Sequence, residues 1–268
     1  MVTRRRFIGG ALGAAAAAAA AAAGVPLELA GELADAGDAP NASPAASSPA
    51  GAGAECVLLD LGSRREIRES FAGYESALTS IAVSWSRSTG EVRHYPRLIV
   101  APAATGLDSA AVTLLAILAC TGSTVVVELA SAFAEDASSF DSDREALREM
   151  MGVEIGQPVN LWPRRSSGMP YVNYLWPARV SVRDFSRVLP LTVPDGDAIA
   201  HVGDMPVAVR CRKDLGTILI LGSPLGAALR SGDAEARRWL GRVVESSRGR
   251  MVDYEARQRE IIAARAAR

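Results

Sequence analysis

Residues 97–129 read RLIVAPAATGLDSAAVTLLAILACTGSTVVVEL, and this stretch decides the fold class. Residues 97–101 form a continuous apolar run and 124–129 a second run rich in valine, so both predict buried strands. Between them, Asp108 is typical of a helix N-cap, and Gly122 is typical of the position just beyond a helix end. Strand, helix and strand in this order predict parallel strands joined by a crossover helix.

The same alternation extends over the rest of the domain. Strands are predicted at 56–61, 206–211 and 217–221, and helices at 64–78, at 141–151 and from Asp233 onward. Continuous apolar strands that alternate with helices need cover on both faces of their sheet. We therefore expect a three-layer α/β domain, flavodoxin-like in outline, with a mostly parallel sheet. Residues 156–205 contain prolines and short alternating runs, which predict a small insertion of antiparallel strands and loops.

Composition excludes several function classes. The chain has 268 residues and a formal charge of -1, which argues against a nucleic-acid-binding protein. Three cysteines are too few for a disulfide scaffold, and with only two histidines the chain has few ligands for a metal site. The glycine-rich phosphate cradles are missing, so we expect neither a cofactor nor a metal. Cys56, Cys120 and Cys211 lie in apolar runs and should be free thiols, although a Cys56–Cys211 bridge between two strands is an alternative.

The N-terminus predicts an export signal. Arg4 and Arg5 precede Phe7 and a long run of alanines, an arrangement that resembles the twin-arginine type. The export machinery would then be one partner, and the protein would be periplasmic or extracellular. The predicted segments are a signal at 1–24, a flexible Ala/Pro/Ser/Gly linker at 25–54, a domain at 55–250 and a charged helix at 251–268.

The middle of the chain resembles a known superfamily. Residues 95–127 combine an extended run, a proline, a loop, an Asp-started helix, a glycine and a second extended run. This order resembles the class I glutamine amidotransferase-like superfamily, and it is similar to non-catalytic branches such as the trimerisation domain of some β-galactosidases. Residues 216–224 resemble the last core strand of that group. The resemblance covers about 55–155 and 205–245, and it implies a fold and a role in assembly or binding.

The catalytic residues of that superfamily are not matched. Its enzymes carry a cysteine after one core strand and a histidine, a proline and a glutamate after the last. Alignment on Gly122 places Leu129 at the cysteine position, and alignment on Pro224 places Ser223 and Leu225 at the histidine and glutamate positions. Because a cysteine nucleophile needs a base and the base needs an orienting acid, the resemblance does not extend to glutamine hydrolysis.

Three other residues are candidates for a pocket at the strand ends. Glu128 interrupts an apolar strand at its carboxyl end, where open α/β sheets bind ligands, and Ser223 and Thr105 complete the candidate set. A buried acid must be paired or hydrogen-bonded, so Glu128 either pairs with an arginine or lines a polar pocket. The acids at 141–145 lack the spacing of a calcium loop and are predicted to be first-turn helix acids.

A group of aromatic residues is the best surface candidate. Trp162, Tyr171, Tyr174 and Trp176 are interleaved with arginines, and such a group can stack on a sugar ring or a protein partner. The alternative is that these rings cover the edge of the core.

The leading hypothesis is an exported, non-catalytic domain that acts in binding or assembly. A homo-oligomer is compatible with this role. The alternatives are an exported hydrolase that uses Ser223 and Glu128, and an accessory subunit of a cell-envelope complex.

Overall fold

The computed structural model describes residues 53–61, 68–89, 92, 96–133, 137–162, 170–184, 186–194 and 196–249. The predicted signal, nearly all of the predicted linker and the predicted C-terminal helix lie outside these residues. Within the described part of the chain, every helix is too short or too polar to cross a membrane.

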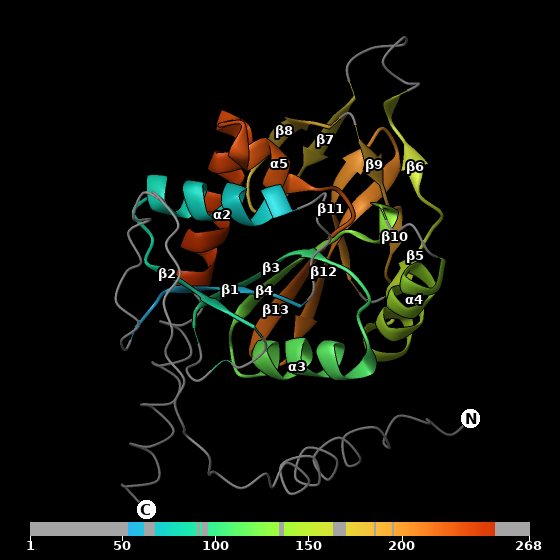
Figure 1. The fold of residues 1–268 in the computed structure, drawn as a ribbon, viewed down its shortest axis with the longest axis horizontal. Helices are drawn as coiled ribbons and strands as arrows, with labels where there is room; N and C mark the ends of the chain where they lie inside the picture. The colour runs from blue at the N-terminus through green and yellow to red at the C-terminus, as the bar shows by residue number, and fades with distance from the viewer. Residues whose placement is uncertain are drawn as a thin grey trace, which may run out of the picture. The chain divides into compact units, whose positions relative to one another are not determined.

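A nine-stranded sheet forms the centre of the domain (Figure 1). In spatial order its strands are β2 (Trp85–Ser88), β1 (Cys56–Leu59), β3 (Leu98–Ala104), β4 (Thr124–Leu129), β13 (Gly216–Leu221), β12 (Met205–Lys213), β11 (Asp197–Val202), β7 (Tyr171–Tyr174) and β8 (Val180–Arg183). The first five strands pair in parallel, and their order is that of flavodoxin-like sheets. The remaining strands pair antiparallel. The predicted fold class is confirmed.

Helices cover both faces of the sheet, as Figure 1 shows. The helical elements are α2 (Arg68–Ser80), α3 (Ser109–Cys120), the short 3-10 helix η2 (Ser131–Phe133), α4 (Ala137–Met151), α5 (Leu225–Arg230) and a helix at 234–249. One face is covered by α2, α5 and 234–249, and the other by α3 and α4. Two small antiparallel sheets complete the domain: β5 (Glu154–Ile155) with β10 (Leu191–Thr192), and β6 (Val159–Asn160) with β9 (Arg187–Val188).

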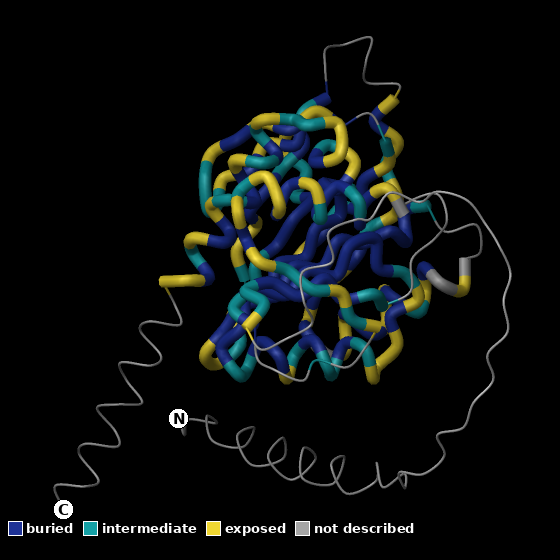
Figure 2. The backbone as a smooth tube through the Cα atoms, turned by 60° about the vertical axis from the view of Figure 1, so that its left-hand side comes forward, coloured by how far each residue is buried: buried dark blue, intermediate teal, exposed yellow. Residues whose placement is uncertain are grey.

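Strand periodicity assigns each side chain of a buried strand to one layer. In β4, Val126 packs under α2 and α5, whereas Val125, Val127 and Leu129 pack under α3 and α4. Successive side chains of a strand point to opposite faces, so Glu128 is directed to the same layer as Val126. Figure 2 shows the central strands as the buried part of the domain.

The sequence predicted the buried elements better than the peripheral ones. Asp108 caps α3 by accepting a hydrogen bond from the Ala111 amide, as expected. Helix α4 begins at Ala137, so the prediction that Asp141 lies in a first turn was wrong. The predictions also missed β2, a polar edge strand, and α5, where only a turn was expected. The three cysteines are free, so the Cys56–Cys211 bridge is absent.

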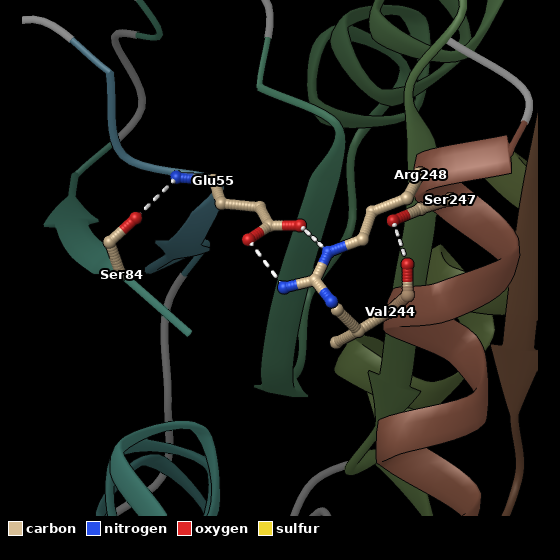
Figure 3. Close-up of polar contacts among 5 residues, drawn as sticks. All are labelled: Glu55, Ser84, Val244, Ser247 and Arg248. Carbon is tan, nitrogen blue, oxygen red and sulfur yellow. Dashed lines mark hydrogen bonds and ion pairs between the residues drawn. The ribbon is translucent and has the colours of Figure 1, made fainter. Parts of the chain in front are cut away.

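An ion pair joins the two ends of the described domain (Figure 3). Arg248, near the end of helix 234–249, donates two hydrogen bonds to Glu55, the residue before β1, at 2.5 and 2.9 Å. The Arg248 guanidinium lowers the pKa of Glu55. The Glu55 amide also donates to Ser84 Oγ at 3.1 Å. The chain therefore enters the domain beside the point where helix 234–249 ends.

Candidate functional site

Three parallel strands, β3, β4 and β13, end next to one another, and the candidate pocket residues lie at these ends. Thr105 follows β3 and is half-buried, whereas Glu128 and Ser223 are buried, at 0% and 4% exposure. Strand pairing aligns Glu128 with Leu221, two residues before Ser223. The structure thus brings Glu128 and Ser223 to the same edge of the sheet.

Among the described residues, the donors to Glu128 are hydroxyl and amide groups, and none is an arginine. Ser70 Oγ donates to Glu128 Oε1 at 2.6 Å, and Tyr74 Oη donates to Oε2 at 3.0 Å. The Gly226 amide donates to Oε2 at 2.9 Å, and the Ala103 amide is a fourth hydrogen-bond donor. Of the two alternatives that the sequence left open, the arginine pair is not observed, because hydroxyl and amide groups satisfy this carboxylate instead.

Burial dominates the electrostatics of this network. It raises the pKa of Glu128, and the hydrogen bonds from Ser70, Gly226, Tyr74 and Ala103 only partly offset that effect. The pKa of Tyr74 is also raised well above its usual value, first by burial and then by the Glu128 charge. A phenol with a raised pKa stays protonated, so Tyr74 is a stable donor to Glu128.

The backbone around Glu128 is closely packed and locally strained. A Cβ placed on Gly73 in α2 would lie 2.0 Å from the Gly226 carbonyl oxygen, and one on Gly226 would lie 2.4 Å from Ser70 Cα. Glycine at both positions thus lets α2 and α5 approach closely enough for both to reach Glu128. Ala103 has a φ of 50°, a left-handed conformation that costs energy for alanine, at an irregular point of the β3–β4 register.

Ser223 belongs to a second hydrogen-bonded group. Its hydroxyl donates to Asp184 Oδ2 at 2.5 Å, and Asp184 Oδ1 accepts from the Ser186 amide at 2.7 Å and from the Ser186 hydroxyl at 2.5 Å. Asp184 follows β8 and is buried. The turn at 223–226 is therefore held at its first residue by Asp184 and at its last by Glu128.

A third buried acid lies at the same edge on the opposite face of the sheet. Asp143 in α4 accepts a hydrogen bond from the Leu107 amide in the loop after β3. Burial raises the pKa of Asp143 to about 6, although Leu107, Ser131 and Gly106 act in the other direction. Among the described residues, Asp143 Oδ2 and Ser131 Oγ lack a hydrogen bond of normal geometry.

A histidine is not found beside these acids in the described part of the chain. His201, the histidine that the structure describes, lies in β11, where it pairs with Pro206 in β12 and Asn173 in β7. His94 lies outside the described residues. Within the described ranges, acids, cysteines and histidine do not gather into a group that could hold a metal ion.

The positions aligned with the amidotransferase triad are packed into the core. Leu129 is 1% exposed under α3 and α4, and Leu225 is 1% exposed under α2 and the helix at 234–249. The thiol that precedes this region, Cys120, is half-buried with a raised pKa, owing to burial and to its hydrogen bond with Asp214. A raised pKa disfavours the reactive thiolate.

The four aromatic candidates do not form one surface. Trp162 is 57% exposed and Tyr171 is half-buried, with the Arg183 guanidinium 6.0 Å from its ring. Trp176 is also half-buried and has Arg210 above its ring at 4.8 Å. Tyr174 is buried, and its ring centroid lies 4.8 Å from that of Trp239, so its assignment to a binding surface was wrong.

Sequence reasoning missed the partners of the candidate residues. Ser70 and Tyr74 are four positions apart, one face of a helix, and Gly73 inside that helix is a sign of close backbone approach. These signals were present but did not point to Glu128. Asp184 gave no signal beyond its position after an alternating run.

Comparison with known proteins adds a fold likeness. No protein-family model matches the sequence, and no curated protein matches it. The β-galactosidase from Bacillus circulans sp. alkalophilus is 14% identical with a TM-score of 0.50, and the match covers 70% of this chain and 31% of that one. A GH42 β-galactosidase from G. stearothermophilus is 15% identical with a TM-score of 0.51, and the match covers 70% of this chain and 30% of that one.

A shorter protein is matched over nearly its whole length. A cytoplasmic protein from Salmonella typhimurium LT2 is 12% identical with a TM-score of 0.51, and the match covers 71% of this chain and 98% of that one. This chain spans about a third of the length of the glycosidases that it matches. At these identities the likeness concerns the fold alone: the domain is folded like a part of GH42 β-galactosidases.

Proposed function

We propose that this protein is an exported, non-catalytic member of the amidotransferase-like fold, and that it acts by binding or assembly. The observation that carries the proposal is the structural role of Glu128 and Ser223. Both hold the turn at 223–226 through buried hydrogen bonds, and neither contacts the described histidine. Their geometry serves the packing of α5 against α2.

The electrostatics of Glu128 support this assignment. All four donors around Glu128 belong to the fold itself, so both of its oxygens are engaged in hydrogen bonds with α2, α5 and β3. A general acid or base also has to reach substrate, and Glu128 is 0% exposed. The residue therefore stabilises the packing of the segments around it and does not act on substrate.

The fold likeness supports assembly as the role. The matched solved structures include β-galactosidases in which this fold accounts for about a third of the chain. The sequence also resembles the trimerisation domain of some β-galactosidases, a part that contributes to assembly. A domain of this fold that lacks a nucleophile and a base at the aligned positions is suited to holding partners together.

A hydrolase is the second candidate, and one contact favours it. The Ser223 hydroxyl lies 2.5 Å from Asp184 Oδ2, as a serine with an acidic partner would. The hypothesis then needs Asp184 to act as the base, yet Asp184 and Ser223 are both buried away from substrate. We place this candidate below the non-catalytic one.

Export is part of the proposal because of the N-terminal pattern. Arg4 and Arg5 before an alanine-rich run support export by the twin-arginine route. A further version of the role, an accessory subunit of a cell-envelope complex, follows if the binding partner resides in the envelope.

The test compares turnover with stability. Ester and glutamine hydrolysis would be measured for the wild-type chain and for Ser223→Ala, with thermal unfolding of both. We expect no turnover that depends on Ser223, and a lower Tm for Ser223→Ala because Asp184 Oδ2 loses the hydrogen bond from the Ser223 hydroxyl. A variant that keeps the wild-type Tm but loses a measurable turnover would refute the proposal.

A further inference from the structure

Helix α3 differs from the other long helices of the described domain in having no charged side chain. Its 12 residues read SAAVTLLAILAC, whereas α2 and α4 carry both acidic and basic residues. The side of α3 that faces the sheet is buried through Val112, Leu115, Leu118 and Ala119. A helix that is apolar on all sides is normally covered on all sides.

The outward side of α3 is nevertheless open to solvent. Ile117 is 45% exposed, and Leu215, in the turn between β12 and β13, is 44% exposed. That turn lies against the C-terminal end of α3, because Asp214 accepts a hydrogen bond from Cys120 and a Cβ on Gly216 would lie 2.3 Å from the Ala119 carbonyl oxygen. We define the α3 face as Ala110, Thr113, Leu114, Ile117, Cys120 and Leu215.

Charges border the α3 face at its two ends. Asp108, which is exposed, lies at the N-terminal end of the helix. Lys213 lies at the C-terminal end, close enough for its charge to lower the pKa of the Cys120 thiol. Asp214, which accepts the hydrogen bond of Cys120, adds a negative charge beside Lys213. The helix itself carries no charged side chain, with an acid at one end and a base beside an acid at the other.

We propose that a second copy of this chain docks on the α3 face, with the two α3 helices antiparallel about a two-fold axis. This inference rests on the proposed role in assembly and names the partner. An apolar face is complementary to itself, and an antiparallel arrangement brings Asp108 of one copy to Lys213 of the other. In this arrangement the dipoles of the two helices are antiparallel, which is the favourable orientation.

The expected association is weak. A helix of 12 residues is about 18 Å long, and its outward face with one turn beside it is smaller than the roughly 800 Å² per partner of a standard interface. We expect a micromolar dimer with most of its stability from the central apolar side chains, Ile117 above all.

The experiment is sedimentation velocity of the full chain across a concentration series, with four substitutions. Ile117→Glu should raise the dimer Kd at least about tenfold, since it places a charge in the centre of the contact. Ser76→Glu, at an exposed position of α2, is the matched control and should leave the Kd unchanged. Lys213→Glu should weaken the dimer several-fold by placing two acids together, and adding Asp108→Asn should recover part of the loss. Asparagine remains a good N-cap, so the helix is kept.

Any of three results would overturn the inference. The first is a wild-type chain that sediments as a monomer at about 100 μM, a concentration at which a micromolar dimer is nearly complete. The others are an Ile117→Glu chain that associates like wild type, and a Lys213→Glu defect that Asp108→Asn does not relieve. None of them bears on the turnover test, so failure here is distinguishable from failure of the non-catalytic assignment.

Discussion

Replacing Asp143 with asparagine should stabilise the protein at neutral pH and leave it unchanged in acid. Asp143 is fully buried, and burial raises its pKa from 3.8 to about 6. An acid whose pKa is raised on folding binds its proton more tightly in the folded state. Its contribution to stability is therefore complete below pH 3.8 and is lost as the pH rises through about 6.

The magnitude follows from the size of that shift. Two pK units, at about 1.4 kcal/mol each, correspond to ~3 kcal/mol between the acidic and neutral limits. Asparagine avoids this cost because it is neutral at every pH. It also keeps an oxygen to accept from the Leu107 amide and places an amide donor beside Ser131.

The assay is urea denaturation, followed by tryptophan fluorescence, of wild type and Asp143→Asn at several pH values. The difference in unfolding free energy should be near zero at about pH 3 and should approach ~3 kcal/mol in favour of asparagine at about pH 8. Asp143→Ala is the matched comparison. At every pH it should be less stable than Asp143→Asn by about 1–3 kcal/mol, because the buried Leu107 amide loses its acceptor. The reasoning fails if Asp143→Asn is the less stable protein at pH 8, or if the difference does not change with pH.

Three further outcomes are expected. Gly73→Ala should lower the unfolding free energy by about 1–3 kcal/mol, because the new Cβ would lie 2.0 Å from the backbone of α5. Gly241→Ala, in a helix with nothing within 4 Å, should be neutral or slightly stabilising by the same denaturation assay; equal losses at both positions would count against the close-packing argument. Leu129→Ala should cost about 2–5 kcal/mol because this side chain packs in the core, and a fully stable variant with lost turnover would contradict that assignment. Replacing Arg4 and Arg5 together by lysine should stop export, as measured by fractionation, and normal accumulation outside the cytoplasm would speak against the signal.

The local sequence pattern was enough to predict the strands that are buried along their whole length. The valines of β4 and the apolar run of β13 predicted their strands, and the predicted bounds of β4 were those observed. Asp108 was identified as a cap because a cap is formed within one turn of the helix. The weak predictions concern elements whose positions depend on neighbours: β2, which has a polar sequence, and α5, which is only six residues long.

The partners of Glu128 could not be predicted from the pattern. They lie 58, 54 and 98 residues away in the chain, at Ser70, Tyr74 and Gly226. The sequence indicated that a buried acid at this position needs compensation, and it left an arginine and a polar pocket as the choices. Tyr174 is a similar case, since an alternating strand predicts two faces but not which one meets Trp239.

By itself, the sequence determined the α/β class and the order along the chain of the buried central strands and the helices between them. These follow from local periodicity and from residue identity. Only the tertiary structure decided that Glu128 and Asp184 brace one turn, and that α3 keeps an open apolar face. The physical reason is that hydrogen-bond partners and exposure depend on which distant segments the folded chain brings together, and no local pattern encodes that.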